Sequence, residues 1–151
     1  GWVRTAPDLQ SYPDQIVSQS MSLPHEFIQR ETDRGLRMLY EPVAELENLR
    51  TGVLTEDVDG LAAAEGELAE ILIEFEKAGT HKITINGIDA SFDGRSARIF
   101  SDRNTNEVYI DGGLEYRTYR REPSQTGFSE TKIGSDTAIK SLQVFRLKSI
   151  W

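Results

Sequence analysis

The stretch SDRNTNEVYIDGG, residues Ser101 to Gly113, decides the fold. It follows Ala97-Arg98-Ile99-Phe100, and within it Val108 and Ile110 alternate with more polar neighbours, which predicts a strand. The residues Asn104 to Asn106 predict a turn before that strand. The residues Asp111-Gly112-Gly113 predict the next reversal, because Asp and Gly tolerate positive φ. The stretch therefore reads as strand, turn, strand and turn.

Short segments of period two continue on both sides of this stretch and predict further strands. Asn86-Gly87 and Asp93-Gly94 are dipeptides typical of hairpin turns. Short strands at such regular spacing indicate a β-sandwich. The expected strands are Lys82–Asn86, Ala90–Phe92, Ala97–Ser101, Glu107–Ile110, Glu115–Tyr119 and Leu142–Ile150.

Residues 61–77 (LAAAEGELAEILIEFEK) fit two interpretations. Ala, Glu and Leu give the segment a high helix propensity. The apolar residues Ala69, Ile71, Ile73 and Phe75 nevertheless alternate with their neighbours, as in a strand. Composition and periodicity leave both interpretations open.

Other segments are simpler to interpret. Residues 1–30 are strand-like and interrupted by prolines, and Pro42–Arg50 is the best helical segment, with Pro42 in its first turn. Residues 122–137 form a polar loop or a weak strand around Phe128.

Four motifs together resemble one known family. The hairpin is similar to the D-R-x-S-x-E-V-F-x-N-D-G segment in the C-terminal β-sandwich of glycoside hydrolase family 32, the invertases, levanases and inulinases. Residues 19–27 (QSMSLPHEF) resemble that family's M-S-L-P-R-E-L strand, with His25 in place of Arg and Phe27 in place of Leu. Residues 37–50 resemble L-x-Q-x-P-V-x-E-L-x-x-L-R, and residues 142–151 resemble a closing strand that ends in L-x-S-I-W.

The resemblance implies an all-β chain: a β-sandwich of the concanavalin-like or jelly-roll type, preceded by a β-propeller blade remnant and a short linker helix. The implied domains are 1–41 for the last-blade remnant, 42–52 for the linker helix and 53–151 for the sandwich. The family opens its sandwich with an E-L-x-E-I-x-L-x-F strand, and this resemblance favours a strand for residues 61–77. The parent enzyme would be a retaining hydrolase of β-fructofuranosyl bonds in sucrose, levan or inulin, secreted or periplasmic.

The three acidic motifs of that family, W-M-N-D-P-N-G, R-D-P and E-C, do not occur in this sequence. The nearest string, Arg121-Glu122-Pro123, is interpreted as an exposed turn. We therefore expect no catalytic residue in this chain and a structural role beside the propeller catalytic domain, its expected partner. The alternatives are a carbohydrate-binding module and a stand-alone homologue that has lost catalysis.

Composition limits the function further. The 151 residues carry a net charge of −8, which argues against nucleic acid as a partner. The chain has no Cys, which excludes disulfides and thiolate sites. No apolar run has the length of a membrane span, and no signal-peptide core follows Gly1. We expect no cofactor, no metal, no membrane contact and a possible homo-oligomer through an exposed strand at residues 19–30, which lacks its propeller neighbours.

Candidate site residues favour structural interpretations. Asp102 and Glu107 could form a glycosidase carboxylate pair, but we expect a turn cap and a strand start, with Arg103 pairing with Glu107. His25 and His81 lack further ligands at zinc spacing, and Glu56–Gly60 is a solvated acidic turn rather than a calcium loop. Fructan binding is expected to be weak or absent, with Tyr109 and Tyr116 as the candidate sugar contacts. The other aromatic residues expected to pack are Trp2, Tyr12, Tyr40, Tyr119 and Trp151.

Overall fold

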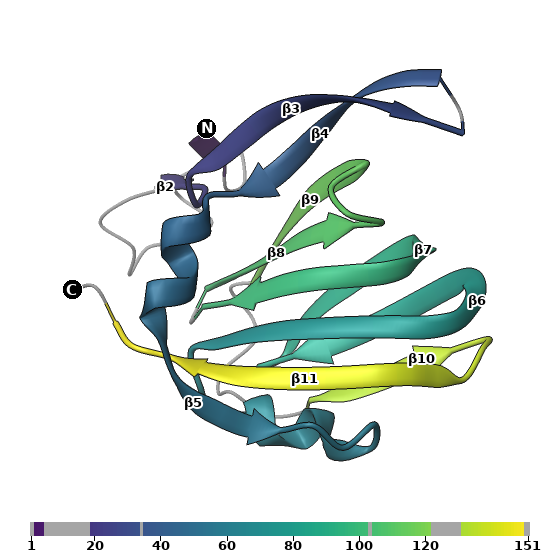
Figure 1. Ribbon diagram of the computed structural model, residues 1–151. Helices are drawn as coiled ribbons and strands as arrows, with labels where there is room; N and C mark the ends of the chain where they lie inside the picture. Colours follow the sequence, from purple (N-terminus) through teal and green to yellow (C-terminus); the bar gives the residue numbers. More distant parts are fainter. Residues whose placement is uncertain (1, 5–18, 34, 103, 122–130, 150–151) are drawn as a thin grey trace.

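The computed structural model describes residues 2–4, 19–33, 35–102, 104–121 and 131–149, and these residues are mostly strand. Figure 1 shows a sheet-rich body with a separate hairpin above it. The N-terminal strands are β1 (Trp2–Arg4), β2 (Gln19–Met21), β3 (His25–Thr32) and β4 (Gly35–Pro42). The later elements are η2 (Ala44–Leu49), β5 (Arg50–Thr55), η3 (Gly60–Ala64), β6 (Ala69–Ile85), β7 (Ile88–Ser101), β8 (Thr105–Ile110), β9 (Glu115–Arg120), β10 (Lys132–Ser135) and β11 (Ile139–Leu147).

Seven strands form one antiparallel sheet in the order β5-β11-β6-β7-β8-β9, and β10 also pairs with β6. The longest pair is β6 with β7, and its register shifts between Glu74 and Gly79. Before that shift β6 pairs with β11, and beyond it β6 pairs with β10. Apolar side chains from both halves of β6 lie in one buried core. The all-β sandwich that the sequence predicted is therefore confirmed.

The core residues follow the period-two pattern of the strands. On β6, Ile71, Ile73 and Phe75 are almost completely buried, whereas the alternate residues Leu72 and Glu74 are half-buried on the outer face. The strand expected in residues 61–77 is confirmed from Ala69 onward, whereas residues 61–64 belong to the 3-10 helix η3. Burial of the alternating apolar residues outweighs the helix propensity of Ala, Glu and Leu.

The turn at Asn86-Gly87 is confirmed: both residues have positive φ, 53° and 76°, as a two-residue hairpin loop requires. The expected turn at Asp93-Gly94 is wrong, because β7 runs straight through both residues. Gly94 is needed there for space, since a Cβ would lie 2.7 Å from Cγ2 of Ile110. A glycine inside a strand marks a close approach here rather than a reversal.

Several boundaries differ from the expected ones. The turn expected at Asn104–Asn106 comes earlier, with the Asp102 amide donating to the Thr105 carbonyl, and β8 starts at Thr105. The expected helix is a 3-10 helix of six residues, and Pro42 ends β4 instead. β10 lies inside the expected polar loop, while Phe128, Glu122, Pro123 and Ile150 lie outside the described residues. Among the described residues, no helix is long and apolar enough to cross a membrane.

The hairpin β3–β4 forms its own two-stranded sheet, paired in register from His25↔Pro42 to Thr32↔Gly35. In Figure 1 it lies above β9, and η2 connects it to β5 at the side of the sandwich. β5 already pairs with β11 from Arg50 onward, so the sheet begins within the segment 42–52 that was expected to be linker. The proposed domain limits themselves stay predictions.

Candidate functional site: the junction between hairpin and sandwich

Among the described residues, the hairpin contacts the sandwich through a backbone hydrogen bond and a cluster of side chains. The Tyr40 amide on β4 donates to the Gly113 carbonyl in the turn between β8 and β9, over 2.9 Å. Gly113 has φ +88°, and a Cβ there would lie 2.2 Å from the Tyr40 carbonyl oxygen. The reversal predicted at Asp111–Gly113 therefore has a second role, because its glycine lets the hairpin backbone approach the sheet.

Glu107 on β8 is the polar centre of the side-chain cluster. It is 4% exposed, and its two carboxylate oxygens accept hydrogen bonds from the Leu23 amide at 2.8 Å and the Tyr116 hydroxyl at 2.5 Å. Burial raises the pKa of Glu107, and the two hydrogen bonds oppose that shift. Because Leu23 immediately precedes the hairpin, this carboxyl ties the N-terminal segment to the sandwich.

Aromatic rings surround the hydrogen bonds of Glu107. The His25 ring on β3 lies 5.0 Å from the ring of Tyr116 and 5.7 Å from that of Tyr40, measured between centroids. Tyr40 stacks on Tyr116 at 5.8 Å and 21°. We call the set Leu23, His25, Tyr40, Glu107, Tyr109 and Tyr116 the hairpin clasp. Its members come from both sides of the junction, so it holds the hairpin on the sandwich.

The two candidate sugar contacts both lie in the clasp. Tyr109 is 2% exposed, and its ring packs against Phe100 and Tyr116. Tyr116 is half-buried, with Tyr40 stacked on it and its hydroxyl donating to Glu107. Burial raises the pKa of both phenols, which keeps them neutral. Packing against neighbouring rings explains both positions, and sugar contact at these positions stays a prediction.

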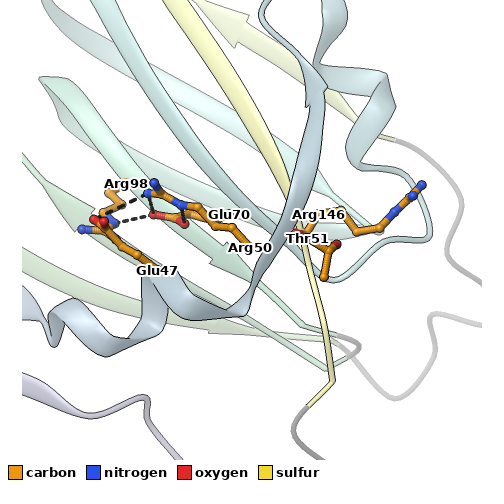
Figure 2. A network of polar contacts seen from close by, with 6 residues as sticks. All are labelled: Glu47, Arg50, Thr51, Glu70, Arg98 and Arg146. Atoms are coloured by element: carbon orange, nitrogen blue, oxygen red, sulfur yellow. Dashed lines mark hydrogen bonds and ion pairs between the residues drawn. The ribbon is translucent and has the colours of Figure 1, made fainter.

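A second cluster fixes the linker helix to the sheet (Figure 2). Glu70 on β6 is fully buried, and it accepts from Arg50 Nε at 2.6 Å and Arg98 Nε at 2.7 Å. Glu47 on η2 lies 3.4 Å from Arg98 and 3.7 Å from Arg50. Two carboxylates and two guanidinium groups thus neutralise one another across η2, β5, β6 and β7. A buried charge is tolerated when it is paired and hydrogen-bonded in this way.

The remaining candidates have structural surroundings. His81 is buried and stacked on Phe75 at 3.5 Å, with its ring nitrogens 2.9 Å from Ser135 Oγ and 3.0 Å from the Gly94 carbonyl oxygen. The Asp59 amide donates to Asp57 Oδ1 within the acidic turn. Within the described ranges, no group of three or more His, Asp or Glu residues could hold a metal ion.

The expected carboxylate partners are placed differently. Asp102 is exposed at the turn, whereas Glu107 is buried, and both oxygens of Glu107 are already engaged by Leu23 and Tyr116. Arg103, which was expected to pair with Glu107, lies outside the described residues. Tyr12 and Trp151 lie outside them as well. Sequence reasoning missed the role of Glu70, because β6 also carries Glu74 and Glu76 at the same alternation and nothing in the sequence distinguishes the buried carboxylate from them.

No protein-family model matches the sequence, and no curated protein matches it significantly. Solved structures do match. An exo-inulinase from Aspergillus awamori aligns with 95% of this chain at a TM-score of 0.67 and 12% identity. A glycoside hydrolase family 32 protein from Bifidobacterium adolescentis aligns with 100% of the chain at 0.67 and 21%. A sucrose-6-phosphate hydrolase from Lactobacillus gasseri aligns with 82% at 0.58 and 14%.

The fold and the clasp define a class: an all-β sandwich that holds an additional β-hairpin against one sheet edge. That fold is present in the family 32 glycoside hydrolases, as the four sequence motifs predicted. This chain covers 39%, 33% and 29% of the three enzymes, so it spans a third or so of their length.

Proposed function

We propose that this chain is the C-terminal, non-catalytic β-sandwich portion of a family 32-like glycosidase, in which it supports a catalytic propeller. The observation that carries the proposal is the asymmetric coverage: nearly the whole chain aligns with less than two fifths of each enzyme. The absence of all three acidic motifs from the sequence agrees with it. The parent enzyme would act on β-fructofuranosyl bonds in sucrose, levan or inulin.

The hairpin supplies the surface for the propeller. Phe27, Leu36 and Met38 are 62%, 55% and 51% exposed. In the β3–β4 register Phe27 faces Tyr40 and Gln29 faces Met38, so these apolar side chains share one face of the hairpin with Tyr40, whose ring the clasp holds against the sandwich. Exposed apolar residues that gather on one face favour an interaction surface. The clasp would transmit the position of this surface from the sandwich to the propeller.

Two measurements test the proposal. First, the reading frame upstream of Gly1 should encode a W-M-N-D-P-N-G segment roughly a propeller's length away. Second, the purified chain should not hydrolyse sucrose, inulin or levan, whereas the same chain joined to that upstream segment should hydrolyse at least one of them. Turnover by the purified chain alone, or an upstream frame without the motif, would contradict the proposal. If the chain is instead a stand-alone homologue, the upstream frame should lack the W-M-N-D-P-N-G motif.

A further inference from the structure

Two clefts lie on the outer face of the sandwich sheet. The first, of about 490 Å³, lies between the hairpin and strands β6, β7 and β8, and the second, of about 470 Å³, lies beside β11. Leu72 and Ser141 line both clefts, so the clefts join at these residues. Figure 1 shows β11, β6, β7 and β8 side by side in the sheet. We call the joined clefts the outer-face groove.

The groove is built on the strand alternation. Gln143 faces Leu72 across β11 and β6, and Leu72 faces Arg98 across β6 and β7. One row of side chains therefore crosses three strands, and a second row runs from Ser141 through Glu74 to Ser96. These side chains point away from the core, because their sequence neighbours are buried in it. Each row presents hydrogen-bonding groups, and Leu72 is the apolar residue in the middle of the first row.

The charges that line the groove balance, three cations against three carboxylates, and one of the carboxylates, Glu56, accepts a hydrogen bond from the Gln143 side-chain amide at 2.8 Å. Lys140 lies 3.0 Å from Glu74. Arg30 lies 2.8 Å from Glu41 on the hairpin wall. Arg98 is bound to the buried Glu70. A groove whose charges cancel in this way offers an anionic or cationic ligand little net attraction, whereas its carboxylates, guanidinium groups and amides remain strong partners for hydroxyl groups.

We propose that the outer-face groove binds a neutral glycan chain. The elongated form suits a linear chain of sugar units, the rows of polar side chains suit its hydroxyl groups, and Leu72 suits an apolar sugar face. The volumes fall in the range of ligand sites in proteins. Of the two expected sugar contacts, Tyr109 lines the first cleft, whereas Tyr116 lines neither. The inference rests on the proposed function in one respect, because that function is the reason for testing a fructan as the first probe.

The test is a titration of the isotope-labelled chain, followed by amide chemical shifts, with two neutral probes: a fructan pentasaccharide from inulin, and maltopentaose. We expect saturable shifts at Leu72, Ser141 and Gln143 with at least one probe, and a dissociation constant of about 1 mM, as for a shallow open site. Absence of saturable shifts with both probes, or shifts that gather outside the groove, would overturn the proposal.

Variants locate the binding. Ser141→Tyr places a ring where the two clefts join, and we expect it to weaken binding at least fivefold. Gln143→Ala should weaken binding about threefold, and it serves as the second variant if the first does not fold. Glu76→Ala is the matched control, because Glu76 is exposed on the same strand as Leu72 and lines neither cleft. Unchanged affinity in the folded groove variants would refute the inference.

The outcomes separate this inference from the proposed function. If the chain restores hydrolysis when joined to its upstream segment but shows no saturable shifts, the proposed function is supported and glycan binding in the groove is refuted. If the chain binds either probe in the groove but its upstream frame has no catalytic motif, glycan binding in the groove is supported and the role in a glycosidase is refuted.

Discussion

The Gly113 carbonyl accepts from the Tyr40 amide at 2.9 Å, and the Gly113 α-carbon leaves no room for a side chain against that same tyrosine backbone. A turn residue of the sandwich is thus also the point at which the hairpin docks. The clasp adds Glu107 as a second attachment through Leu23. These contacts join two segments more than seventy residues apart in the sequence, and the predictions below address their strength.

Gly113→Ala should detach or misplace the hairpin. The new methyl group would lie 2.2 Å from the Tyr40 carbonyl oxygen, and the residue would keep an unfavourable φ of +88°. We expect a loss of about 2–4 kcal/mol in the free energy of unfolding and faster proteolysis at the hairpin. Gly112→Ala is the matched control: its φ is also positive, but its Cβ would meet nothing within 4 Å, so it should cost about 1 kcal/mol. Equal losses in both variants would refute the close-approach argument.

Glu107→Gln should change the pH dependence of stability. Burial raises the pKa of Glu107 above its unfolded value, so the contribution of this carboxyl to stability is fully present below the unfolded pKa and is lost as pH rises through the folded pKa. Gln stays neutral and can still bond to Leu23 and Tyr116. The stability of the variant relative to wild type should therefore improve as pH rises from the unfolded pKa, about 4, through the raised folded pKa, by about 1.4 kcal/mol per unit by which the pKa is raised. Denaturant titrations at several pH values test it, and a constant difference would contradict it.

Removal of the two clasp hydroxyls should have opposite effects. The Tyr109 hydroxyl is buried without a hydrogen-bond partner among the described residues, whereas the Tyr116 hydroxyl donates to Glu107. Tyr109→Phe should therefore be neutral or should stabilise by up to about 1 kcal/mol. Tyr116→Phe should destabilise by about 1–2 kcal/mol, because a buried carboxylate loses a donor. Thermal unfolding of the two variants side by side decides the matter, and an equal loss in both would show that the hydroxyl of Tyr109 is bound.

Glu70→Ala should be among the most damaging single substitutions in the sheet. It removes the buried carboxylate that both Arg50 and Arg98 bind and leaves the two guanidinium groups with only the more distant, half-exposed Glu47. We expect a loss of about 3–5 kcal/mol. Glu115→Ala is the comparison, because it breaks the ion pair with Arg117, in which both side chains are about half exposed, and it should cost little. Similar unfolding midpoints for the two variants would contradict a structural role for Glu70.

The sequence by itself determined the features that are local in the chain. Alternation predicts which residues of β6, β8 and β11 enter the core, because successive side chains of a strand point to opposite faces. The Asn86-Gly87 turn is equally local, since it needs residues that accept positive φ. Four motifs in register indicated the fold that the solved structures then confirmed.

Tertiary structure alone decided the rest. Asp93-Gly94 has the composition of a turn, yet it lies inside a strand, because packing against Ile110 uses its missing side chain. Glu70 finds Arg50 and Arg98 through sheet register, and Glu107 finds Leu23 through the docking of the hairpin. No spacing rule encodes these pairs, because the partners are brought together by strand order and not by neighbouring positions. Propensity and periodicity act over a few residues, whereas burial, pairing of charges and the groove on the outer face arise when distant strands meet.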